Sequence, residues 1–470
     1  MTGRSDGEAR SREALIAAIV VIAIAMLFGG GSRSDLESHV IVRPVAIAVL
    51  AWSLIKGIGA RKRGLLAPLW LAVLWSAMIG VQLIPLPPSL WASLPHRREF
   101  FDIFRAIHVD KVWRPLTMSP NATLNAFFAS VVPLSVLAAM ARLRQRDMPV
   151  IVGCLLAIGA LSALLGVVQI TSQARWAYFY LITNEGAGVG LFANRNHQAL
   201  LMAEIFPMLA LVAAWPQVKR RQRRLNEFMA LSAAVLLVPL VLITGSRAGL
   251  VLLMVGIVAA AAILGLDGPA LLRNFRRSKV RRSEADRARL VPLLLAAGLV
   301  GMVGLTVVLS RAEAVNRLFS EDVSQEIRLK LFRTMVQVGN DFAPWGGGFG
   351  TFDPLFRMRE PFSNLSPIYI NHAHDDLLEI YIEGGVVALG LLLAFLTWMA
   401  PRSVRAWRRA EGPLPPEQLA ARCGSAIIAM TLIASLADYP LRTAAHQAVV
   451  AVAVAMLAAW SSGKRTFSGP

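Results

Sequence analysis

The stretch PVIVGCLLAIGALSALLGVVQI, residues 149–170, sets the fold class of this chain. It contains no charged side chain, and it exceeds the roughly 20 mostly apolar residues that a helix needs to cross the hydrocarbon core of a bilayer. The rest of the 470-residue chain is similar, with 56% hydrophobic and 16% charged residues and a mean hydropathy of +0.56. Ordinary globular domains carry about 25% charged residues. Composition therefore excludes a soluble, disordered, collagen-like or disulfide-rich protein.

With residues 149–170, the chain contains twelve candidate membrane spans. They cover 14–30, 40–55, 65–84, 122–140, 149–170, 198–215, 227–244, 248–266, 290–309, 377–400, 418–437 and 443–460. The first span lacks the cleavage site of a signal peptide and eleven more follow it, so we expect it to be retained. The sequence thus predicts an all-α polytopic membrane protein with about 12 transmembrane helices. Spans 1–9 fall in residues 1–309, a long outer loop with short helices in 310–376, and spans 10–12 in 377–470.

The net charge of +19 and the pI of about 11.1 raise the question of nucleic-acid binding. Sorting the charges by loop answers it. When the gaps between spans are numbered along the chain, the even-numbered gaps and both termini lie on one side of the membrane. This side holds 30 basic and 10 acidic residues, a net charge of +20. The other side holds 18 basic and 19 acidic residues, a net charge of −1. Basic residues in short loops mark the cytoplasmic side. We therefore expect both termini in the cytoplasm, membrane lipids as partners of these loops, and no nucleic-acid partner.

The unusual polar residues lie on the opposite, outer side. Asn194, Arg195, Asn196 and His197 come directly before the sixth span and are suited to binding phosphate or sugar hydroxyls. A helix N-cap with an interfacial histidine explains the same residues equally well. Arg247 lies in the short turn between the seventh and eighth spans, where an arginine either binds an anion beside a helix N-terminus or reaches the lipid headgroups.

Two further motifs belong to the long outer loop. Apolar residues at helical spacing over 323–336 predict an amphipathic helix that carries Arg328, either toward a ligand or on a solvated face. His372 and His374 with Asp375 and Asp376 stand where this loop enters the tenth span. One histidine held by a carboxylate is sufficient for general base catalysis. A metal site is the weaker reading, because a third histidine at ligand spacing is missing.

The order of these motifs resembles the O-antigen ligase and O-antigen polymerase superfamily. The resemblance rests on a proline-rich first outer loop (85–121) and on five further segments. They are FANRNH at 192–197, SRAG at 246–249, RLKLF at 328–332, PWGGGFGTF at 344–352 and HAHDDLLEIYIEGG at 372–385. His374 with Gly385 fits the histidine-to-glycine spacing of the ligases. Asp375 stands where that pattern has Asn, Ser or Gln, and Phe332 where Leu or Trp is usual.

The resemblance implies a bacterial inner-membrane glycosyltransferase with a GT-C-like helical fold and an active site on the periplasmic face. Such an enzyme takes a glycan from undecaprenyl diphosphate and passes it to a hydroxyl of the lipid A core or of another glycan. It needs no cofactor and no metal. From the chemistry, we expect a single displacement that inverts the anomeric carbon. The catalytic residues would be His374, Arg247 and Arg328. The substrate-binding residues would be Asn194, Arg195, Asn196, His197, His372 and Asp375.

Within this reading, a ligase acting on the lipid A core is the first interpretation, and a polymerase of O-antigen or exopolysaccharide is the alternative. Transfer to a protein hydroxyl is a further activity of the same superfamily. A transporter that moves lipid-linked glycans without chemistry is the rival from another class, because twelve spans also suit a transporter. The sequence shows no convincing repeat between its halves and few charges at mid-membrane depth, such as Glu204. Both observations favour the enzyme.

Overall fold

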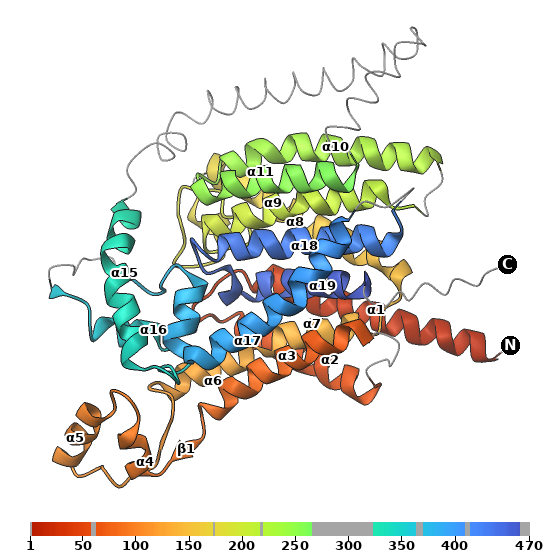
Figure 1. Cartoon of the computed structure of the whole chain (residues 1–470). Helices are drawn as coiled ribbons and strands as arrows, with labels where there is room; N and C mark the ends of the chain where they lie inside the picture. Colours follow the sequence, from red (N-terminus) through yellow and green to blue (C-terminus); the bar gives the residue numbers. More distant parts are fainter. Residues whose placement is uncertain are drawn as a thin grey trace.

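The structure is a computed structural model that describes residues 2–57, 63–172, 174–216, 220–265, 323–362, 370–408 and 414–460. Within these ranges, twelve helices form a bundle, and the other elements gather at one end of it (Figure 1). The ninth expected span, 290–309, lies outside the described residues. The bundle helices are α1 (Thr2–Phe28), α2 (His39–Ile55), α3 (Arg63–Val81), α6 (Pro120–Ala129), α7 (Val131–Met140), α8 (Met148–Ser172), α9 (Arg195–Ala214), α10 (Arg220–Leu242), α11 (Arg247–Ile263), α17 (Asp376–Trp407), α18 (Pro416–Ala434) and α19 (Ala444–Trp460).

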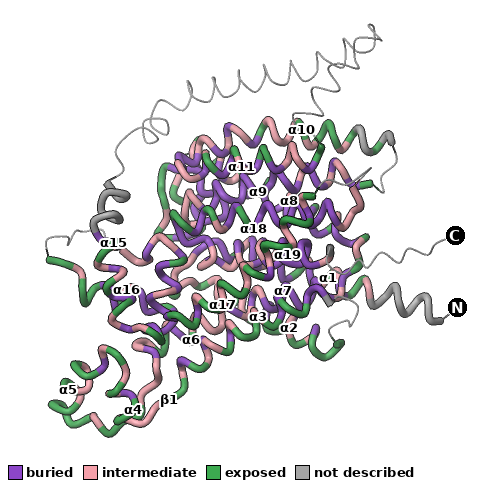
Figure 2. Tube along the Cα trace, in the orientation of Figure 1, coloured by how far each residue is buried: buried purple, intermediate pink, exposed green. Residues whose placement is uncertain are grey.

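The expected class, an all-α polytopic membrane protein, is confirmed. Seven helical segments of the described ranges are long and apolar enough to cross a membrane. They differ in how much of their surface the bundle covers: 83% of the hydrophobic window of α9 is buried, against 22% of that of α10. Figure 2 shows the same contrast, with α9 largely purple and α10 mostly pink and green. Because exposed apolar side chains are stable against lipid, α9 belongs to the centre of the bundle and α10 to its lipid-facing edge.

The elements outside the bundle form one end of the molecule. The helix expected from residues 323–336 is present as α15 (Val323–Asp341), and α16 (Phe352–Arg357) packs beside it. The first outer loop contains α4 (Pro88–Ser93) and α5 (Arg98–Ala106). Its base is closed by a two-stranded antiparallel ribbon of β1 (Pro85–Leu86) and β2 (Arg114–Pro115), paired Pro85 to Pro115 and Leu86 to Arg114. The start of α1 lies at the opposite end of the bundle (Figure 1).

Helix α17 is interrupted at Gly385, where the backbone has φ 61° and ψ −156°. Only glycine adopts this conformation easily, and a Cβ there would lie 2.0 Å from the carbonyl oxygen of Pro344. The loop after α15 holds the break in place: the amide of Val386 donates to Pro344 O over 2.9 Å, and that of Gly348 to Glu383 O over 2.9 Å. The first part of α17 is thereby fixed against this loop, with its acidic residues pointing into the bundle end.

Candidate functional site

The centre of the site is the buried carboxylate of Asp438, in the loop between α18 and α19. It accepts hydrogen bonds from the side-chain amides of Asn194 over 2.9 Å and Asn196 over 2.6 Å. Its other oxygen lies 3.2 Å from Nδ1 of His374. A carboxylate can only accept, so Nδ1 carries the hydrogen and Nε2 of a neutral His374 is left as a base. Asp438 thus joins two motifs that are far apart in the sequence.

The surroundings of Asp438 stabilise the charged form of its carboxyl group. Burial would raise the pKa of this carboxyl, but the hydrogen bond from His374, the nearby His197 and the hydrogen bond from Asn196 outweigh it and hold the pKa well below its usual range. His374 itself adopts φ 53°, which is uncommon for a residue other than glycine. Such conformations persist where surrounding contacts enforce them, often at functional sites.

A second histidine–carboxylate pair lies beside the first. Nδ1 of His372 is 2.8 Å from Glu379 Oε1, and the amide of Ala373 donates to Glu379 Oε2 over 3.0 Å. The ring of Tyr439 lies against both histidines, with centroid distances of 4.2 Å to His372 and 4.9 Å to His374. Burial alone would lower the pKa of His372, but the charge of Glu379 and the hydrogen bond to it raise the pKa above the ordinary value.

Arg442 holds three buried carboxylates from the first part of α17. Its Nη1 lies 2.8 Å from Glu383 Oε2, its Nη2 3.4 Å from Glu379 Oε1 and its Nε 3.8 Å from Asp376 Oδ1. Ser435 also donates to Asp376 over 2.7 Å. Burial opposes the charge of Arg442, but the three carboxylates raise its pKa above the usual range. The loop between α18 and α19 is therefore tied to α17 by charge.

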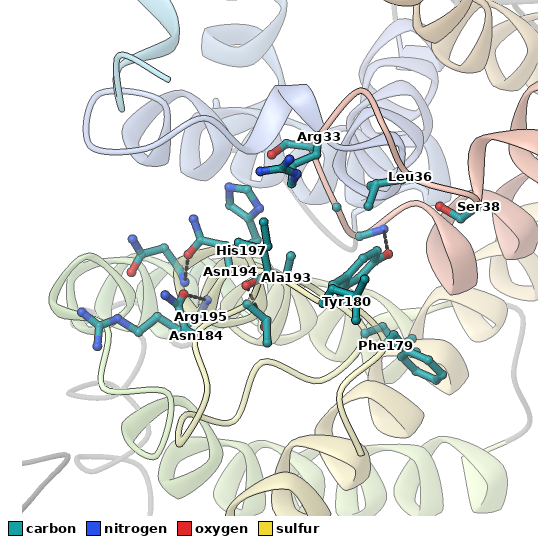
Figure 3. A pocket seen from close by; sticks show the side chains of 18 of the residues that line it. Arg33, Leu36, Ser38, Phe179, Tyr180, Asn184, Ala193, Asn194, Arg195 and His197 are labelled. Atoms are coloured by element: carbon teal, nitrogen blue, oxygen red, sulfur yellow. Dashed lines mark hydrogen bonds between the residues drawn. The ribbon is translucent and has the colours of Figure 1, made fainter. Parts of the chain in front are cut away.

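Two cavities open beside this cluster. The first, called the large cavity, has a volume of about 1850 Å³ and is lined by residues that include Arg33, Arg195, Arg247 and His374. Figure 3 shows Arg33 on one side and Asn194, Arg195 and His197 on the other. Helices α9 and α11 both begin at this cavity, capped by the side chains of Asn194 and Ser246. Two helix N-termini and several guanidinium groups make it suited to an anion.

The second, called the small cavity, has a volume of about 580 Å³. It shares Ser32, Arg33, Asp35 and Asn371 with the large cavity, so the two adjoin along the loop after α1 and at Asn371. The two histidines are divided between them: His374 lines the large cavity and His372 the small one. In the described ranges, no group of three or more His, Cys, Asp or Glu side chains is arranged to hold a metal ion.

The site residues predicted from the sequence lie in different places in the structure. Those that line the large cavity are Asn194, Arg195, Asn196, His197, Arg247 and His374. The ring of His197 is almost fully buried, at 2% exposure, and neither ring nitrogen has a hydrogen-bond partner. Asp375 lines neither cavity: it caps α17 by accepting hydrogen bonds from the amides of Leu377 over 2.9 Å and Leu378 over 3.1 Å. Arg328 belongs to α15, but its side chain lies outside the described residues.

The sequence reasoning missed Asp438, Tyr439 and Arg442. All three lie in the short gap between the last two spans, in the segment DYPLR at 438–442. An acid and an arginine so close to the membrane edge are costly unless they are paired. This cost could have indicated Asp438 and Arg442 in the sequence, because the same argument indicated Arg247.

Comparison with known proteins adds one finding. Residues 232–393 match the family model described as O-antigen ligase. The match contains Arg247, His372 and His374, whereas the segments at 192–197 and 438–442 lie outside it. No curated protein matches the chain. The match confirms the resemblance noted in the sequence and supports a membrane enzyme that processes glycans; it covers about a third of the chain.

Proposed function

We propose that this protein transfers a glycan from undecaprenyl diphosphate to an acceptor hydroxyl at the periplasmic face of the bacterial inner membrane, as an O-antigen ligase acting on the lipid A core. The observation that carries the proposal is that Arg195, Arg247 and His374 line one cavity at the end of the bundle. The charge distribution supports the orientation, because the basic loops belong to the opposite side.

The donor diphosphate would occupy the large cavity between the first turns of α9 and α11. Breaking the bond between the sugar and the diphosphate leaves negative charge on the departing group, which must be stabilised. Guanidinium groups can do this by charge-assisted bidentate hydrogen bonds, and arginine keeps its charge at every relevant pH. Arg195, Arg247 and Arg328 would fill this role. No metal ion is needed in this scheme.

His374 would be the general base. The acceptor oxygen attacks the anomeric carbon, the bond from that carbon to the diphosphate oxygen breaks, and the acceptor proton passes to Nε2 of His374. Asp438 orients the ring and stabilises the charge that forms on it. Undecaprenyl diphosphate leaves as an anion. A single displacement of this kind inverts the configuration of the anomeric carbon.

The test uses purified protein in proteoliposomes with a fluorescent glycan on undecaprenyl diphosphate and lipid A core as the acceptor. We expect transfer with inversion, visible in the anomeric NMR signals of the product, and its loss in Arg195→Ala, Arg247→Ala and Arg328→Ala. The matched control is Arg98→Ala, because Arg98 is exposed on α5 and lines neither cavity. Movement of the donor across the bilayer without transfer would overturn the enzyme in favour of a transporter. Growth of the lipid-linked glycan itself would assign a polymerase.

A further inference from the structure

The small cavity is polar at one end and apolar at the other. At the outer end it is lined by Asp353 and by the cluster around Arg442, and it then runs along α17 past its break at Gly385. Leu391, Leu392 and Phe395 line the deeper part, with Val450 and Val454 of α19. From Gly385 to Phe395, the rise of the helix covers about 15 Å. A cavity of this shape matches an amphipathic molecule with a polar headgroup and a hydrocarbon chain.

The charges of the two cavities differ. The lining of the large cavity includes three arginines and three acids, and one of the acids, Glu185, is paired 2.8 Å away with Arg175, which is not part of the lining. The lining of the small cavity includes two arginines and five acids, and one of these acids, Asp353, is paired 2.6 Å away with Arg357, which is not part of the lining. Its charged residues are Arg33, Asp35, Asp353, Asp376, Glu379, Glu383 and Arg442. Carboxylates that outnumber the cations in a partly enclosed space disfavour a phosphate group.

The position of the small cavity fits an acceptor. It meets the large cavity at Asn371, and His372 faces it from the next position in the chain. The ring of Trp75 lies in its wall, with its centroid 5.3 Å from that of Phe349. An aromatic wall with carboxylate acceptors is suited to a sugar, which has an apolar face and several hydroxyl donors.

From these observations we infer that the small cavity is the acceptor site and takes a lipid-anchored sugar whose accepting unit carries no phosphate. The inference rests on the proposed transferase function and adds the acceptor's chemistry to it. The hydrocarbon chain lies along α17 and α19, the sugar lies against Trp75 and His372, and its hydroxyl reaches the donor at the junction near Asn371.

Binding can be tested without catalysis. The probe is a dodecyl β-glucoside with a diazirine in its alkyl chain, photo-crosslinked to the full-length protein in nanodiscs. We expect saturable labelling of the cavity-lining residues of α3 and α17, such as Leu71 and Leu392. Excess dodecyl β-glucoside should abolish the labelling, and its 6-phosphate should compete at least tenfold less well. Equal competition by the two compounds, or labelling that does not saturate, overturns the inference.

A matched pair of variants on α3 checks the location. Ala72 lines the small cavity, whereas the neighbouring Val73 is exposed and does not. We expect Ala72→Trp to reduce saturable labelling at least tenfold and Val73→Trp to leave it unchanged. In case Ala72→Trp folds poorly, Asp353→Asn is the second variant. The side chain of Asp353 is 38% exposed, so we expect this substitution to leave folding intact. It should bring the affinities for the two competitors closer together, and an unchanged ratio contradicts the proposed charge selection.

The transfer assay separates the two proposals. Transfer that proceeds normally in Ala72→Trp, with an unchanged acceptor KM, overturns the acceptor site but leaves the transferase function. Saturable labelling as described, but without transfer to any acceptor, overturns the transferase function but leaves the binding site. If both proposals hold, the acceptor KM of Ala72→Trp rises at least tenfold and the donor KM is unchanged.

Discussion

The two histidine–carboxylate pairs invite comparison, because they lie against the same tyrosine ring and face different cavities. His374 is held by Asp438 and faces the arginine-lined large cavity, whereas His372 is held by Glu379 and faces the acidic small cavity. The supporting carboxylates also differ: Asp438 is bound by two amides and a histidine, and Glu379 lies beside Arg442. Two similar histidine–carboxylate pairs can therefore have different local charge, because one carboxylate is bound by neutral amides and the other lies beside a guanidinium group.

Substitution of the two histidines should give the largest difference between the two pairs. We expect His374→Ala to lower the rate of transfer by about 10²–10⁴-fold, the usual contribution of a general base. His372→Ala should act mainly on the acceptor KM, because His372 faces only the small cavity. Initial rates over a range of donor and acceptor concentrations measure both effects. The reverse pattern, with kcat lost in His372→Ala and retained in His374→Ala, would exchange the roles of the two pairs.

The next effect concerns stability and belongs to Arg442 alone. Replacing Arg442 with leucine leaves Asp376, Glu379 and Glu383 buried without their shared cation, and breaking a buried ion pair in this way costs about 3–5 kcal/mol. We expect a large fall in the Tm of the detergent-solubilised protein. The control is Arg359→Leu, which breaks the more exposed pair with Asp341 and should cost no more than about 1 kcal/mol. Equal effects of the two substitutions would show that the cluster around Arg442 does not hold the bundle end together.

The two pairs should also respond to pH in opposite directions. The pKa of His372 is raised in the folded protein, so its contribution to stability is complete below the ordinary value of 6.5 and is lost as the pH rises through the folded-state pKa. Asp438 has a lowered pKa, and its contribution is present above the ordinary value of 3.8 and is lost on acidification. Thermal unfolding from pH 6 to 9 should therefore show a decline for the wild type that is smaller in His372→Gln. Parallel curves would contradict the raised pKa.

The helices of this fold could be predicted from the sequence because a long apolar run indicates a membrane-spanning helix by its own composition. The stretch at 149–170 forms α8, and eleven of the twelve expected spans coincide with described helices. The convergence of the site could not be predicted in the same way. Asp438 and Asn194 are separated by 244 positions, and no local pattern shows that the loop after α18 meets the start of α9. The two cavities likewise depend on how the helices pack. Only the structure therefore shows that His374 lines one cavity and His372 the other.

The smallest expected effect concerns Asp375, which the sequence indicated as a substrate-binding residue and the structure shows as the N-cap of α17. Loss of an N-cap costs about 1 kcal/mol, so Asp375→Ala should lower the Tm slightly and leave the donor and acceptor KM values within about twofold of the wild type. Asp375→Asn is the matched variant, because an amide oxygen can accept the same hydrogen bonds from Leu377 and Leu378 and removes only the charge. It should retain both stability and activity. A rise in either KM that is shared by both variants would show that the carboxylate charge contacts a substrate, and would extend the binding surface beyond the two cavities.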